Sequence, residues 1–182
     1  MKKIFVFISL SVLLIQCNSE TPRYTIAQGK VGLVSKDMTT QQIDSVYASD
    51  SVVYQNTKGQ FLNNTNIEIF EAGGEKLLSL SRSKDENRKD KISHVQIFDS
   101  RFKTDNGASL DSDFKAFRDH YKIKSIQKMI NTVIVFFQDQ DFYVTIDMEE
   151  LPDELKIKKN IIIESIHIPD TAKIKYLMLG WE

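Results

Sequence analysis

Two stretches of this chain follow the same order of secondary-structure signals, and this repetition constrains the fold more than any other feature. Thr39 and Ser109 each precede an apolar run with helical spacing, and Ile43 in the first run lies 71 residues before Phe114 in the second. The same offset separates Asp99 from Asp170, each of which follows a later apolar segment. Because an offset shared by two elements is hard to produce by chance, the sequence predicts a tandem duplication.

Three strand signals follow each expected helix. They lie at 67–71, 76–80 and 92–98 in the first unit, and at 132–137, 142–146 and 161–168 in the second. Alternating antiparallel strands with helices on one face predict an α+β fold. We expect two tandem α-β-β-β units in a two-layer helix/antiparallel-sheet arrangement, paired edge to edge. The alternative is a single α+β domain with accidental internal likeness.

The start of the chain has the order of a secretory signal. Lys2 and Lys3 precede an uncharged run over 4–15, and Cys17 is the only cysteine. The run is too short for a membrane-spanning helix, which needs about 20 apolar residues. The segment Leu14-Ile15-Gln16-Cys17 resembles the lipobox of bacterial lipoproteins, which implies that Cys17 becomes the lipidated first residue. Plain secretion and a retained apolar N-terminus are the alternatives.

These signals divide the chain into four parts. We predict a signal peptide over 1–16, a polar tether over 17–24, a first unit over 25–105 and a second over 106–182. Lipidation would attach the protein to a membrane of the bacterial cell envelope. The sequence leaves open which membrane and which side.

Composition excludes several kinds of function. Removing Lys2 and Lys3 with the signal leaves 22 basic and 25 acidic residues, a net charge of −3, which gives no electrostatic case for nucleic-acid binding. Once Cys17 is acylated, no thiol remains for a disulfide, a nucleophile or a sulfur-bound metal. We therefore expect the fold to depend on core packing alone.

The layout also resembles known envelope lipoproteins. A lipidated cysteine, a polar tether and a helix start of the type Lys36-Asp37-Met38-Thr39-Thr40 are similar to small outer-membrane lipoproteins of the BamE/SmpA type. The tandem layout is similar to that of beta-lactamase inhibitory proteins. This resemblance implies a non-catalytic protein-binding or scaffold lipoprotein, with an envelope protein as partner.

The polar residues give no clear catalytic or metal site. Carboxylates occur in pairs, but the pairs fall at an expected helix start and in turns, where they have structural roles. None of the three histidines has a second ligand at metal-binding spacing. We predict no catalytic residue, no metal and no cofactor; a hydrolase using an Asp/Glu pair is the weaker alternative. These residues are Asp111, Asp113, Asp139, Asp141, Glu149, Glu150, His94, His120 and His167.

Aromatic residues exceed what a single packed face needs. Phe136, Phe137, Phe142 and Tyr143 flank one tight turn, and successive strand residues point to opposite faces. Half of these rings should therefore line the helices and half should face outward. Because aromatic anchors dominate protein interfaces, we predict the four as partner-binding residues. The alternatives are that the rings fill the core, that the tail 176–181 packs as a last strand, or that the rings bind a small ligand or lipid.

Overall fold

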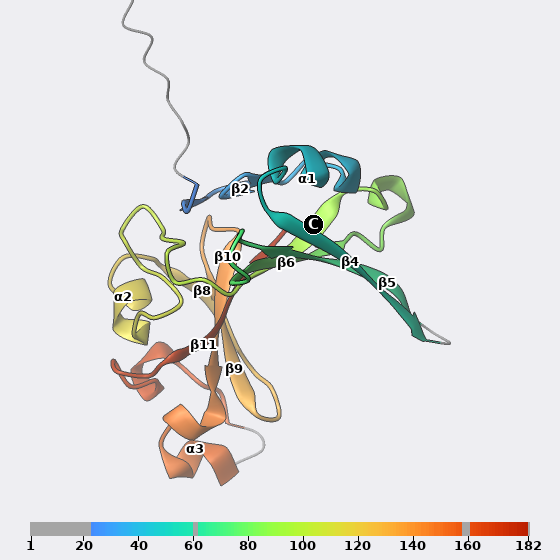
Figure 1. Ribbon diagram of the computed structural model, residues 1–182. Helices are drawn as coiled ribbons and strands as arrows, with labels where there is room; N and C mark the ends of the chain where they lie inside the picture. The colour runs from blue at the N-terminus through green and yellow to red at the C-terminus, as the bar shows by residue number, and fades with distance from the viewer. Residues whose placement is uncertain (1–22, 60–61, 158–160, 182) are drawn as a thin grey trace, which may run out of the picture.

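One large antiparallel sheet dominates the molecule. The computed structural model describes residues 23–59, 62–157 and 161–181 (Figure 1). Eight strands pair in the order β4-β5-β6-β7-β11-β10-β9-β8. Their bounds are β4 (Ser51–Gly59), β5 (Leu62–Phe70), β6 (Lys76–Arg82), β7 (Ile92–Ile97), β8 (Ile123–Lys128), β9 (Thr132–Phe137), β10 (Phe142–Asp147) and β11 (Ile174–Gly180).

A small three-stranded sheet precedes it, formed by β1 (Ile26–Ala27), β2 (Lys30–Val31) and β3 (Val34–Ser35). Its larger apolar residues, Ile26, Val31 and Val34, are buried in the main core. Gly32 has a φ of 54°, and a Cβ there would lie 2.6 Å from the Arg23 carbonyl oxygen. Only glycine fits this turn without strain, so the small sheet can pack closely on the rest of the protein.

Helices are short among the described residues. The α-helices are α1 (Thr40–Val46), α2 (Phe114–Arg118) and α3 (Asp153–Ile157); the 3-10 helices are η1 (Glu86–Arg88), η2 (Met148–Glu150) and η3 (Ser165–His167). The predicted α+β fold, with two α-β-β-β units in a two-layer helix/antiparallel-sheet arrangement, is therefore wrong, because the described chain is mostly β. Helices of five to seven residues cannot cover the sheet. The small sheet and connecting segments, which contribute Phe102, Ile163 and Ile168, complete the core.

The two helix starts differ in how well the sequence predicts them. Thr39 is the N-cap of α1, and its backbone N–H donates to Gln42 Oε1 at 2.8 Å, as predicted. The predicted cap at Ser109 is wrong, because α2 begins after Asp113. Ser109 instead closes a turn: its N–H donates to Ser112 Oγ at 3.0 Å, and its carbonyl accepts the Ser112 N–H at 3.1 Å.

The predicted strand at 161–168 is also wrong. This segment contains η3, with Ile163 buried and Ile162 80% exposed. The strand that corresponds to β7 is β11, formed by the tail of the chain. The two edge strands, β4 and β8, carry polar residues such as Gln55, Lys124 and Gln127, so they lack the apolar signal of the inner strands.

Helix and strands nevertheless repeat in order and in detail. Each half contains a short helix followed by four strands. The backbone N–H of Thr40 donates to Asp90 O at 3.1 Å, and that of Phe114 donates to Ala172 O at 2.8 Å. The β6–β7 pair shifts register between Ser81 and Arg82, and the β10–β11 pair shifts in the same way between Thr145 and Ile146.

These matches correct the 71-residue offset. Thr40 corresponds to Phe114, an offset of 114 − 40 = 74, while the starts of β7 and β11 differ by 174 − 92 = 82. Ile43 therefore corresponds to Phe117 and not to Phe114. Asp99 follows β7, whereas Asp170 precedes β11, so this predicted pair is wrong. The offset changes because the segment between β10 and β11 is longer than the one between β6 and β7.

The halves join where β7 pairs with β11 at the centre of the sheet. Ile97 pairs with Leu177, and Val95 with Leu179. With the 82-residue offset, Val95 corresponds to Leu177 and Ile97 to Leu179, so one pair is the counterpart of the other. The junction therefore has an approximate twofold axis through the Gln96–Met178 pair. All four apolar residues are buried, and the cores of the two halves form one cluster.

This shared core predicts that both halves unfold together. Leu80→Ala in the first half and Leu177→Ala in the second each remove a fully buried side chain and should cost about 2–5 kcal/mol. Each variant should shift one common transition in urea, followed both by far-UV circular dichroism and by fluorescence of Trp181, the only tryptophan. If Leu80→Ala left the urea midpoint of the Trp181 fluorescence transition unchanged, the sheet would not unfold as one cooperative unit.

Candidate functional site

The large sheet has two faces of different character. Tyr54 on β4 donates through its hydroxyl to Asp44 Oδ2 of α1 at 3.0 Å, which places α1 over the same face as Ile67 and Leu80 by register. α1, α2 and the small sheet lie on this side (Figure 1). We call it the covered face, and the opposite one the open face.

Two of the four predicted partner-binding rings belong to the covered face. Phe137 is 2% exposed and Phe142 is 5% exposed. Both pack on residues of α2 and the turn after it: Phe117 lies 6.0 Å from Phe137 and Tyr121 lies 4.9 Å from Phe142 between ring centroids. These two rings pack the interior, which leaves little of either surface for a partner.

The other two rings lie on the open face. Phe136 and Tyr143 are direct cross-strand partners, with ring centroids 5.1 Å apart, and both are half-buried. Tyr176 and Met178 of β11 continue the same face beside them, and Tyr176 is 40% exposed. We call Phe136, Tyr143, Tyr176 and Met178 the aromatic patch.

The first half carries polar residues at the matching positions. Aligning the two halves by strand register matches Phe136 with Glu68, Tyr143 with Ser79, Tyr176 with His94, and Met178 with Gln96. On the covered face the same alignment matches apolar residues with apolar residues, such as Leu78 with Phe142 and Val95 with Leu177. Core packing therefore explains the covered face of both halves. It does not explain the aromatic patch, because the first half forms the same sheet without it.

The paired carboxylates make separate structural contacts. Asp113 occupies the N-cap position of α2 without a side-chain cap hydrogen bond, and it pairs with Lys173 Nζ at 2.5 Å. Asp141 accepts the Gly29 N–H at 2.6 Å. Glu149 pairs with Lys156 at 3.4 Å, while Glu150 accepts the Lys173 N–H at 3.3 Å. These carboxylates thus lie at a helix start and in turns, as predicted. Asp111 and Asp113 also line one open cavity of about 430 Å³, together with Lys115, Asp119 and Lys173.

The histidines are dispersed over different elements. His94 lies on β7, His120 follows α2 and His167 ends η3, so the predicted placement of His167 on a strand is wrong. Within the part of the chain that the structure describes, no group of three or more His, Cys, Asp or Glu side chains could hold a metal ion.

The first described residues are tied firmly to the domain. Arg23 Nη2 donates to both carboxylate oxygens of Asp50, at 2.6 and 2.7 Å, and the Tyr24 hydroxyl donates to Glu71 Oε1 at 2.7 Å. Hydrogen bonds from the Arg101 guanidinium hold the pKa of Glu71 below its usual value. The same guanidinium lies 4.4 Å from the Tyr24 ring centroid. Arg23 and Tyr24 are therefore fixed to the domain.

The predicted lipidation site Cys17, the signal peptide and the tether up to residue 22 lie outside the described residues. No helix in the described parts of the chain is long and apolar enough to cross a bilayer.

Comparisons with known proteins give a likeness of fold. No protein-family model and no curated protein matches the sequence. A crystal structure described as the uncharacterized protein yfeY from Escherichia coli is similar to this chain, with a TM-score of 0.59 and 13% identity. The match covers 87% of this chain and 99% of that one. At this identity the likeness concerns the fold alone, and the resemblance to BamE/SmpA-type lipoproteins stays a prediction.

Sequence reasoning missed part of the aromatic patch. Tyr176 and Met178 stand in the tail, for which a strand was only an alternative, and pairing with β10 brings them beside Tyr143. The available signal was the continuous apolar run of Tyr176, Leu177, Met178 and Leu179, which is consistent with a strand that is apolar on both faces.

The burial of the four rings predicts different effects on stability. Phe137→Ala should cost about 3–5 kcal/mol, because it leaves a cavity among packed rings. Phe136→Ala should cost about 1 kcal/mol, since it removes mainly one half-buried aromatic contact. Urea unfolding of both variants measures the difference, and equal losses would show that Phe136 also packs the interior.

Proposed function

We propose that this chain is a lipid-anchored protein of the bacterial cell envelope that binds a partner protein on its open sheet face and catalyses no reaction. The observation that carries the proposal is the contrast between the two halves on that face. At four matched positions the first half has Glu68, Ser79, His94 and Gln96, all polar, whereas the second half has the residues of the aromatic patch.

A polar open face is what an antiparallel sheet needs when only its other face is covered. The first half follows this rule at the positions that match the aromatic patch. Elsewhere on the same face it carries Val53, which is 40% exposed, and Phe70 and Phe98, whose rings lie beside Lys76. In the second half, three adjacent strands place apolar or aromatic side chains on the open face. Aromatic rings supply much of the binding energy at protein interfaces, so this departure supports a partner surface.

The proposed anchor restricts where the partner can be. Six positions separate Cys17 from Arg23, which is fixed to the domain (23 − 17 = 6). A fully extended chain of this length spans at most about 20 Å. A lipid on Cys17 would therefore keep the domain close to the bilayer surface, which favours a partner that is itself bound to or embedded in the membrane.

Cys17→Ser tests the anchor. Several acyl chains give stable membrane attachment, whereas their loss leaves a soluble domain. The variant should move from the membrane fraction to the soluble fraction, or remain as a heavier precursor with its signal attached. Fractionation and intact-protein mass spectrometry provide the measurement. Identical mass and membrane content for variant and parent would exclude lipidation at Cys17.

Phe136→Ser combined with Tyr143→Ser tests the partner surface. Loss of two aromatic anchors should weaken partner capture by about tenfold or more, with a far smaller loss of melting temperature than Phe137→Ser. Capture is measured by photo-crosslinking in intact envelopes from a probe at Ser125, an exposed open-face residue of β8, followed by mass spectrometry.

Val53→Ser provides the matched control, because Val53 lies on the open face of the first half and is also partly exposed. It should leave capture unchanged. If the double variant captured the same crosslinked protein as the parent, or lost as much stability as Phe137→Ser, the partner surface would have to lie elsewhere.

A further inference from the structure

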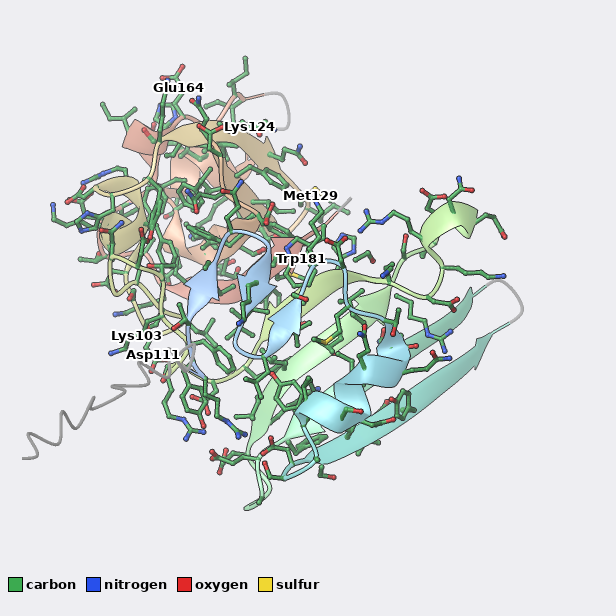
Figure 2. All side chains as sticks on the ribbon, turned by 90° about the horizontal axis from the view of Figure 1, so that it is seen from above. Lys103, Asp111, Lys124, Met129, Glu164 and Trp181 are labelled. Carbon is green, nitrogen blue, oxygen red and sulfur yellow. The ribbon has the colours of Figure 1, made fainter. Side chains whose placement is uncertain are left out.

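A basic pocket of about 620 Å³ lies where β6 and β11 end and β7 begins. Arg82, Lys84, Arg88, His94, Met178 and Trp181 line it, together with serines and Asp85. The backbone N–H of Trp181 donates to Ser93 O at 2.6 Å, and Arg88 Nη1 donates to Trp181 O at 3.5 Å. These contacts join the loop between β6 and β7 to the end of the chain and shape the pocket. Trp181 lies near the middle of the molecule (Figure 2).

Several nitrogen donors in the walls of this pocket lack acceptors. Arg82 Nε, Arg88 Nη2 and Trp181 Nε1 are buried without a hydrogen-bond partner, and they make up three of the five such side-chain atoms in the described chain. Trp181 as a whole is 1% exposed. A buried donor without an acceptor costs about 1–3 kcal/mol, so folded proteins keep few of them. Their concentration around one cavity points to an acceptor that the protein itself does not supply.

The charge of the pocket indicates what kind of acceptor would fit. Three cationic side chains face one carboxylate, that of Asp85, whose Oδ1 already accepts the Asn87 N–H at 2.9 Å as the cap of η1. Across residues 23–59, 62–157 and 161–181, none of the ion pairs involves Arg82, Lys84 or Arg88. Unpaired arginines with free donors suit a carboxylate or a phosphate, which accept charge-assisted hydrogen bonds.

The size and the remaining walls add an apolar part to the ligand. Pockets of roughly 300–1,000 Å³ are typical of small organic molecules and are far larger than a bare ion needs. Met178 is half-buried and provides apolar surface, while Trp181 lines the pocket with 1% of its surface exposed. At Gly180 a Cβ would lie 3.4 Å from Tyr143 and 3.9 Å from His94, which is ordinary contact distance.

We propose that the basic pocket binds a small amphiphilic anion, in which a carboxylate or phosphate group is held by Arg82 and Arg88 and an apolar body lies against Trp181 and Met178. This site is separate from partner binding through Phe136 and Tyr143. Met178 belongs to both the basic pocket and the aromatic patch, so a ligand bound here would lie next to the proposed partner surface.

Four probes test the ligand chemistry on the purified domain: octanoate, octyl phosphate, inorganic phosphate and 1-octanol. Octanoate or octyl phosphate should bind with a Kd below about 1 mM, measured by calorimetry and by the fluorescence of Trp181. Inorganic phosphate and 1-octanol should each bind at least about tenfold more weakly, because each lacks one half of the ligand. Preference for octanoate or for octyl phosphate identifies the acidic group. Equal binding of 1-octanol, or no binding of either anion, would overturn the proposal.

Variants test the residues. Arg82→Gln with Arg88→Gln should weaken binding of the better anion by about tenfold or more, while Arg88→Lys should lose less because it keeps the charge. Lys84→Gln, a loop variant that removes no described contact, provides a second test and should weaken binding measurably if the double variant fails to fold. Lys124→Gln on the far edge strand β8 is the matched control. Unchanged affinity in the folded double variant, or in Lys84→Gln if the double variant is unfolded, would contradict the assignment.

Two further variants distinguish the basic pocket from the partner surface and from a pocket filled by the chain itself. Phe136→Ser should bind the anion normally, so failure of the partner surface and failure of the basic pocket are distinguishable. Glu182 follows Trp181 and lies outside the described residues, so Glu182→Gln asks whether this carboxylate fills the pocket. The proposal expects unchanged affinity. Binding that tightens by about tenfold would show that the chain supplies its own acceptor and would overturn it.

Discussion

The pairing of β7 with β11 is the interaction on which the rest of the structure depends. It joins two four-stranded halves into one sheet and buries Val95, Ile97, Leu177 and Leu179 in a continuous core. It also pairs two strands that would otherwise be exposed edges prone to association. With a single cysteine and only short helices in its described residues, the protein has neither a disulfide nor a thick helical layer there to replace this junction. The open face and the basic pocket both extend across it.

Because the two halves have nearly the same backbone, comparing their residues on each face of the sheet shows which residues the fold requires. The halves share strand order, the register shift beside β7 and β11, and the hydrogen bonds that start their helices, so the first half serves as an internal reference for the second. Apolar residues recur on the covered face because both halves must build the core. The open face differs, with Glu68 and Ser79 in one half and Phe136 and Tyr143 in the other. Folding does not require this difference, so the residues that differ are the best candidates for a binding function.

Local patterns predicted the inner hairpins well, because β5–β6 and β9–β10 combine strong strand formers with clear turns at Gly73-Gly74 and at 138–141. The division of the four rings between two faces also followed from strand alternation alone. The edge strands β4 and β8 were missed because they carry many solvent-exposed polar residues, so they lack the apolar pattern of the inner strands. The last strand of the second half was misplaced because a long irregular segment precedes β11. This segment raises the offset from 142 − 78 = 64, between Leu78 and Phe142, to 82 between β7 and β11. The basic pocket could not be found from sequence, since Arg82 and Trp181 meet only through sheet pairing.

The central claim is that the residues on the open face of the second half, and not the fold itself, create the partner surface. Exchanging all four positions tests it most directly: Phe136→Glu, Tyr143→Ser, Tyr176→His and Met178→Gln give the second half the residues that the first half already carries on the same backbone. Photo-crosslinking in intact envelopes, together with circular dichroism, should show a folded protein that no longer captures its partner. A folded variant that still crosslinks the same protein at the same yield would contradict the account.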